Sequence, residues 1–153
     1  MGLKVTGISE TKARIENDAE RSSRAALREV ERGAKKIVER ARRQAPVDEG
    51  NLENAIKILG HDRGGLNRRK RIVVGVDGSM PVPERPGKTV GDYAGLMHEN
   101  LQPYGIFELG EKSRDKQRNN PDVIVGGKFL ERAAQDLQQE IAQAVLAALR
   151  GRR

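Results

Sequence analysis

The sequence predicts an α+β domain: a long N-terminal helix, a small antiparallel β-sheet with a short helix, and a C-terminal helix packed on the sheet. Three observations predict it. Residues 9–44 contain no proline and repeat apolar side chains at helical spacing, residues 71–77 are rich in β-branched side chains, and residues 128–149 repeat the helical spacing. The 153 residues suit one domain, which we place at 9–150 after an N-terminal arm, 1–8.

The first helix is predicted from Ser9, a candidate N-cap, to residue 44, because Pro46 disfavours helical geometry at Ala45. Its apolar or small stripe is Ile15, Ala19, Ser22, Ala26, Val30, Gly33, Ile37 and Ala41. A helix of this length spans about 50 Å at 1.5 Å per residue, which is more than a domain of this size covers. We therefore expect residues 9–20 either to fray or to take part in self-association.

Two small residues, Ser22 and Gly33, lie within this stripe. Small side chains allow a second backbone to approach closely, but they also weaken a helix. The sequence leaves both interpretations open.

The middle of the chain predicts the sheet. Asp48 is a candidate cap for a short helical turn from Glu49, and residues 55–59 are a strand candidate. Residues 71–77 are the clearest strand, which ends at Asp-Gly. Its alternation places Ile72, Val74 and Val76 on one face and Val73 on the other.

Three segments are predicted as mobile loops, near 60–70, 78–91 and 100–121. Asp92 is expected to cap a short helix over 93–99 that buries Tyr93, Leu96 and Met97. Residues 122–125 either form an edge strand or lead directly into the last helix.

The last helix is predicted over residues 128–149, with Gly151 as its C-cap. Its apolar face is Phe129, Ala133, Leu137, Ile141, Ala144, Val145 and Ala148. Because the chain contains only two tyrosines, two phenylalanines and no tryptophan, we expect a mostly aliphatic core.

The composition limits the chemistry. The chain contains no cysteine, which excludes disulfides, thiol nucleophiles and cysteine-ligated metals. No apolar run approaches the roughly 20 residues of a membrane span, and the N-terminus does not look like a secretory signal. We expect a protein made and used in a cytoplasm, or carried away in something assembled there.

No motif predicts an enzyme, a cofactor or a metal site. His98-Glu99 lacks the second histidine of a metalloprotease helix, since Gln102 occupies that position. Gly87-Lys88-Thr89 lacks the first glycine of a P-loop, where Val82 stands. Asp48 and Glu49 are explained by helix capping, without acid–base chemistry.

The net charge of +7 leaves a second interpretation open, that of a basic nucleic-acid-binding protein. No aromatic residues are interleaved with the basic residues, as single-strand platforms require, so a solvated or subunit-contacting surface is the favoured interpretation. The basic clusters are Arg68, Arg69, Lys70 and Arg71; Arg40, Arg42 and Arg43; and Lys112, Arg114, Lys116 and Arg118.

Four motifs follow one another along the chain. They are Ala-Pro-Val-Asp-Glu-Gly-Asn-Leu at 45–52, the strand at 72–76, Tyr93-Ala94 with His98-Glu99, and Lys-Phe-Leu-Glu-Arg-Ala at 128–133. In this order they resemble the small neck, head–tail joining and tail-completion proteins of tailed bacteriophages, over residues 20–145. The chain departs from that pattern at Asn100, where glycine is usual, and at Lys128, where proline is frequent. These departures leave its level in the neck open.

The resemblance implies a structural virion protein without catalysis or cofactor, located at the head–tail junction and assembled in the host bacterial cytoplasm. It implies a homo-oligomeric ring, with six subunits expected, that contacts connector, neck and tail-tube proteins while genomic DNA passes through without sequence-specific binding. The motif or core residues are then Pro46, Asp48, Gly50, Leu52, Tyr93, Phe129 and Leu130. The candidate interface residues are Arg68, Arg69, Lys70, His98, Glu99, Lys112 and Arg114.

Overall fold

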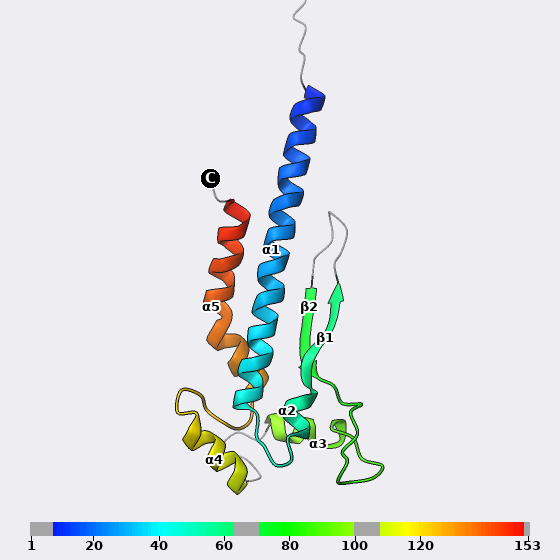
Figure 1. Cartoon of the computed structure of the whole chain (residues 1–153), viewed down its shortest axis with the longest axis vertical. Helices are drawn as coiled ribbons and strands as arrows, with labels where there is room; N and C mark the ends of the chain where they lie inside the picture. The colour runs from blue at the N-terminus through cyan, green and yellow to red at the C-terminus, as the bar shows by residue number, and fades with distance from the viewer. Residues whose placement is uncertain (1–7, 63–70, 100–107, 152–153) are drawn as a thin grey trace, which may run out of the picture.

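The computed structural model describes residues 8–62, 71–99 and 108–151 and confirms the predicted α+β fold (Figure 1). The element order is α1 (Ile8–Gln44), α2 (Asn51–Ala55), β1 (Ile56–Asp62), β2 (Arg71–Val76), α3 (Gly91–Glu99), α4 (Glu111–Asn119) and α5 (Phe129–Arg150).

Helix α1 is the spine of the molecule. Helix α5 lies along one side of its C-terminal part and the β1–β2 hairpin along the other, as Figure 1 shows. The N-terminal part of α1 extends past both, and every residue from 9 to 21 is exposed. The expectation that this helix is longer than the domain covers is therefore confirmed.

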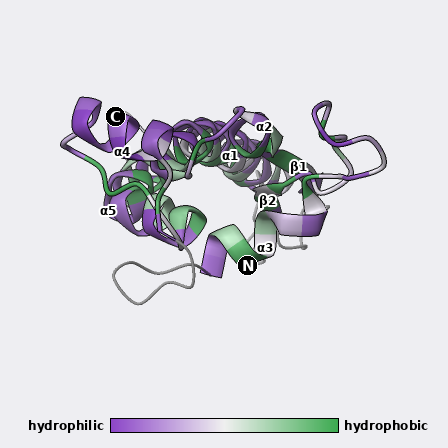
Figure 2. Ribbon diagram, turned by 90° about the horizontal axis from the view of Figure 1, so that it is seen from below, coloured by the Kyte–Doolittle hydropathy of each residue, from purple (hydrophilic) through white to green (hydrophobic). Residues whose placement is uncertain are grey.

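The core surrounds the C-terminal end of α1. Phe129 and Ile56 are fully buried within it, and Figure 2 shows hydrophilic residues on the outer faces of α4 and α5. Phe129, from the first turn of α5, joins that helix to the core beneath the hairpin. The other buried members are Val38, Ala41, Ala45, Leu52, Ala55, Val82, Val90, Ala94 and Ala133, and the partly buried neighbours include Ile58, Val74, Val76, Tyr93 and Leu130.

The contact between α1 and α5 depends on Gly33. This residue is buried, and a Cβ added to it would lie 2.7 Å from Cγ1 of Ile141 on α5. Of the two interpretations of the small residues in the stripe, close approach therefore holds at Gly33.

The hairpin is antiparallel and buries one face. Ile56 pairs with Val76 and Ile58 with Val74, and an irregularity in the register falls between Ile58 and Gly60. Val74 and Val76 pack against the core, whereas Val73 on the opposite face is 44% exposed. The alternation predicted for this strand is confirmed.

The bounds of the first strand differ from the prediction of 55–59. Ala55 belongs to α2, and β1 continues to Asp62, into the segment expected to be a loop. The extension arises because His61 and Asp62 pair with Ile72 and Arg71. Residues 63–70, with the predicted Arg68, Arg69 and Lys70, lie outside the described residues.

Two predicted helix starts were wrong. Helix α2 begins at Asn51 and not at Glu49, because Gly50 takes a left-handed conformation (φ 82°) at the N-cap, and Asp48 makes no cap hydrogen bond. Helix α3 begins at Gly91, before the expected cap: Asp92 lies in its first turn and accepts a hydrogen bond from the backbone N–H of Thr89 (2.7 Å).

The burial predicted for α3 was partly wrong. Tyr93 and Met97 are half-buried as expected, but Leu96 is 55% exposed because it lies beside the buried face of this short helix, about 100° around the axis from Met97. Residues 77–90 form turns joined by one isolated bridge between Pro81 and Thr89.

The largest correction concerns residues 111–121, which the sequence predicts as a mobile polar loop. Residues 111–119 form helix α4, held by hydrogen bonds described below. The alternative of an edge strand at 122–125 was also wrong, since that segment leads without strand pairing into α5. Helix α5 ends as predicted with Gly151, in a positive-φ conformation, at its C-cap.

We predict that Phe129→Ala lowers the free energy of unfolding by about 3–5 kcal/mol, because it leaves a cavity at a fully buried position. Chemical denaturation measures the change. The control Leu96→Ala, at a 55% exposed position, should stay within about 0.5 kcal/mol of the parent. A loss below about 1 kcal/mol for Phe129→Ala would show that the core does not depend on this ring.

We also predict a pH-dependent contribution from Asp77, whose carboxylate lies 2.6 Å from Nζ of Lys57 across the hairpin. Hydrogen bonds from Lys57 and then from Ser79 lower the pKa of Asp77 from 3.8 to about 2. Because the folded-state pKa is depressed, its stabilising effect is present above about pH 4 and is lost as pH falls towards 2.

Asp77→Asn should therefore be less stable than the parent at pH 7, and the difference should shrink as pH falls below 4. Urea denaturation between pH 7 and pH 3 measures this. Asp18→Asn, at an exposed position on α1, is the matched control. A difference that does not change with pH would contradict the prediction.

Candidate assembly interface

The turn from α1 to α2, residues 45–50, contains most of the first motif and lies where α2, α3 and α4 meet (Figure 1). Helix α4 holds this turn through a buried serine. The hydroxyl of Ser113 donates to the carbonyl oxygen of Val47 and accepts from its backbone N–H, each at 2.8 Å. This pair of bonds fixes the chain between Pro46 and Gly50.

Lys116 of α4 caps the C-terminus of α1. Its ammonium group donates to the carbonyl oxygens of Arg42 (2.5 Å) and Ala45 (2.7 Å) and also bonds the carboxylate of Glu53. The last carbonyls of a helix lack intrahelical partners and carry the negative end of the helix dipole, so a cation is favoured there. The Lys116 side chain is only 14% exposed, which strengthens the contact.

Gln117 fixes the connection from α4 to α5. Its side-chain amide donates to the carbonyl oxygen of Val123 and accepts from the backbone N–H of Val125, both at 2.7 Å. Polar helix α4 is thus held in place by hydrogen bonds to backbone groups instead of an apolar stripe.

The basic cluster at the end of α1 is occupied by contacts within the chain. Arg40 lies 3.0 Å from Asp122 and 3.0 Å from Asp136, and Arg43 lies 2.6 Å from Asp122. Arg42 donates to the carbonyl oxygen of Ile56 at 2.9 and 3.1 Å. Burial acts to raise the pKa of Asp122, but the hydrogen bond from Arg40 and the charge of Arg43 outweigh it, so the pKa is lowered.

Beside the turn lies a cleft, here called the acidic cleft. Its apolar lining includes buried Leu52 and Val82 and half-buried Tyr93 and Met97. Its charged lining comprises five acids and two bases: Asp48, Glu49, Glu84, Glu108, Glu111, Arg85 and Lys112. Such a lining is suited to basic side chains of a partner, with an apolar floor for their aliphatic stems.

The charges around this cleft are coupled. Lys112 lies 2.8 Å from Glu49, and that hydrogen bond is the main reason why the pKa of Lys112 is raised. Burial, followed by the charge of Glu84, raises the pKa of Tyr93. The pKa of Glu84 is lowered by backbone hydrogen bonding and by a 2.9 Å bond from Asn51.

His98 and Glu99, two candidate interface residues, connect α3 to the start of α5. The ring of His98 meets Phe129 edge-on, with centroids 5.0 Å apart, and its Nδ1 lies 3.0 Å from Glu99. Glu99 also lies 2.7 Å from the ammonium of Lys128. His98 is thus a packing histidine in the isolated chain, and an interface role for either residue stays a prediction.

The remaining predicted residues are spread over the molecule. Pro46, Asp48, Gly50 and Leu52 line the acidic cleft together with Tyr93 and Lys112, whereas Phe129 lies in the core and Leu130 packs against it. Arg114 is exposed on α4. Sequence reasoning missed Ser113, Lys116 and Gln117 as structural residues, although their spacing of three and four places them on one face of a helix.

Among the residues that the structure describes, no group of three or more histidine, aspartate or glutamate side chains is arranged to hold a metal ion. None of the helices within 8–62, 71–99 and 108–151 is both long and apolar enough to cross a membrane.

Comparison with known families decides the broader identity. Residues 9–97 match the HK97-gp10-like family of bacteriophage proteins, described as candidate tail components. The chain belongs to this family. The match extends from α1 through most of α3, and therefore includes the turn at 45–50 and the hairpin. No curated protein and no solved structure is similar enough to count as a match.

We predict that Lys116→Met loosens the junction, because it removes the charged donor to Arg42, Ala45 and Glu53. The expected loss is about 1–3 kcal/mol in the free energy of unfolding, with faster amide hydrogen exchange over 111–119. The control is Arg114→Met, at an exposed position of the same helix. Equal exchange in both variants would show that Lys116 does not hold α4.

Proposed function

We propose that this protein is a structural subunit of a tailed-phage particle that forms a ring at the head–tail junction and joins the head connector to the tail tube. Within the junction, the subunit takes the position of a neck, tail-completion or tail-terminator protein. The observation that carries the proposal is the family match over residues 9–97, which includes the turn and hairpin motifs.

The shape of the subunit supports an assembly role. An exposed helical segment projects from one end of the molecule, and an acidic cleft lies at the opposite end. Contacts between different surfaces of identical subunits close into a ring when the rotation per subunit is right. We expect six subunits, located in the virion and assembled in the host bacterial cytoplasm.

The contacts of the basic residues weaken the alternative of a nucleic-acid-binding protein. Arg40, Arg42 and Arg43 bond other parts of the chain, and so do Lys112 and Lys116. They are less available for phosphate groups than the sequence suggests. In the proposed ring, DNA passes through the channel without sequence-specific binding, and the subunit catalyses no reaction.

We predict that deletion of the gene leaves filled heads and separate tails, and that supplying the protein in trans restores joined particles. Electron microscopy of lysates measures this. Mass spectrometry of purified wild-type particles should find the protein at a fixed copy number. Normal infectious particles from the deletion, or absence of the protein from wild-type particles, would refute the proposal.

A further inference from the structure

The N-terminal segment of α1, residues 9–20, is a helix without tertiary cover. Every one of its residues is exposed, and Ile15 is 64% exposed. Isolated helices shorter than about 12–15 residues are marginal in water, so this segment gains most from a partner. Its apolar or small residues, Ile15 and Ala19, continue the stripe that α5 covers further along α1.

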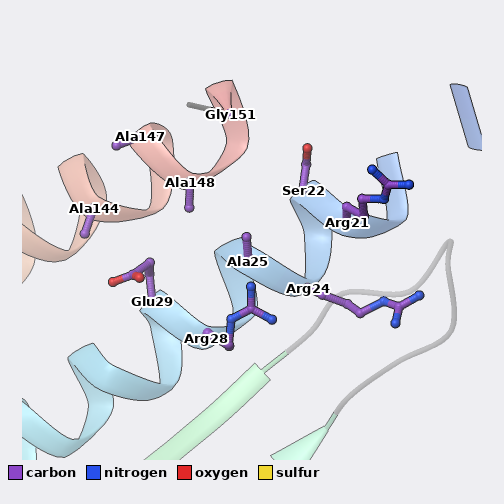
Figure 3. A pocket seen from close by; sticks show the side chains of 10 residues that line it. All are labelled: Arg21, Ser22, Arg24, Ala25, Arg28, Glu29, Ala144, Ala147, Ala148 and Gly151. Carbon is purple, nitrogen blue, oxygen red and sulfur yellow. The ribbon is translucent and has the colours of Figure 1, made fainter. Parts of the chain in front are cut away.

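A cleft lies between α1 and α5 where α5 ends; we call it the upper cleft (Figure 3). Small residues line both sides, as Figure 3 shows for Ser22, Ala25 and Ala148. Ala144, Ala147 and Gly151 complete the α5 side. Small side chains allow a third helix to approach closely, just as Gly33 allows α5 to approach α1.

The charges of the segment and the cleft are complementary. Residues 9–20 contain four acids (Glu10, Glu16, Asp18 and Glu20) and two bases (Lys12 and Arg14), a net charge of −2. The upper cleft contains three bases (Arg21, Arg24 and Arg28) and one acid (Glu29), a net charge of +2.

The ion pairs already present beside the upper cleft are weak enough to be replaced by pairs with acids of another segment. Arg24 pairs with Glu20 at 2.8 Å and Arg21 with Asp18 at 3.9 Å, both within α1 and well exposed. Pairs of this kind contribute only about 0.3–0.5 kcal/mol. Arg28 makes no ion pair with any residue in the described ranges, so an acid from elsewhere has a free partner there.

We propose that residues 9–20 of one subunit occupy the upper cleft of the next subunit. The contact is intermolecular because the segment and the cleft lie on consecutive stretches of one straight helix, so that neither can fold onto the other. Docking is head-to-tail, which leaves a free segment and a free cleft until a ring closes; this direction rests on the proposed ring.

Charge reversal tests the contact. The cleft variant carries Arg24→Glu and Arg28→Glu, and the segment variant carries Glu16→Arg and Asp18→Arg. The parent should form salt-sensitive assemblies larger than a dimer at about 50 mM salt. Each variant alone should associate at least tenfold more weakly. An equal mixture should assemble again, because the basic segment of one variant meets the acidic cleft of the other.

Analytical ultracentrifugation measures the assemblies, and circular dichroism confirms that each variant is folded. The control is Lys35→Glu with Glu39→Arg, an exposed pair further along α1 and outside the cleft lining, which should not change association. A monomeric parent, a closed dimer, or a mixture that fails to recover would each overturn the docking. Such a result would leave the gene-deletion phenotype, and with it the proposed role in joining heads to tails, untouched.

Discussion

The structure depends on how one helix is buried along its length. Only the part of α1 from Ser22 to Gln44 is covered, by α5 on one side and by the hairpin on the other, and the core gathers around its last turns. Two features make this possible. Gly33 lets Ile141 lie directly against the helix backbone, and Lys116 bonds the carbonyl groups of Arg42 and Ala45 at the helix end. The first feature sets how closely α5 approaches α1, and the second ties the end of α1 to α4.

Elements with an apolar period could be predicted from the sequence. Helices α1 and α5 and the alternation of β2 appear in the spacing of apolar side chains, because burial against the core selects that spacing. The end of α1 followed from Pro46, whose ring restricts the preceding residue. These predictions did not require knowing which other elements of the chain each helix or strand packs against.

Helix α4 could not be predicted in that way. It has no apolar stripe, and Ser113, Lys116 and Gln117 are stabilised by backbone groups of residues distant in the sequence or beyond the helix end. The same limit applies to the candidate site.

The sequence indicated Pro46 to Leu52 and Lys112 separately, but only the fold brings them together beside Tyr93. The basic residues at the end of α1 were identified as charged surface, although Arg40 and Arg43 hold the approach to α5.

The core also shows that the boundary of family similarity is not a boundary of cooperative folding. The match ends at residue 97, yet Val123, Val125, Phe129 and Ala133 beyond it are almost fully buried. A fragment cut at that point would expose the underside of the hairpin and leave the carbonyls at the end of α1 unsatisfied. The matched residues 9–97 therefore depend on the residues that follow them to remain folded, and the two parts must be expressed in one polypeptide.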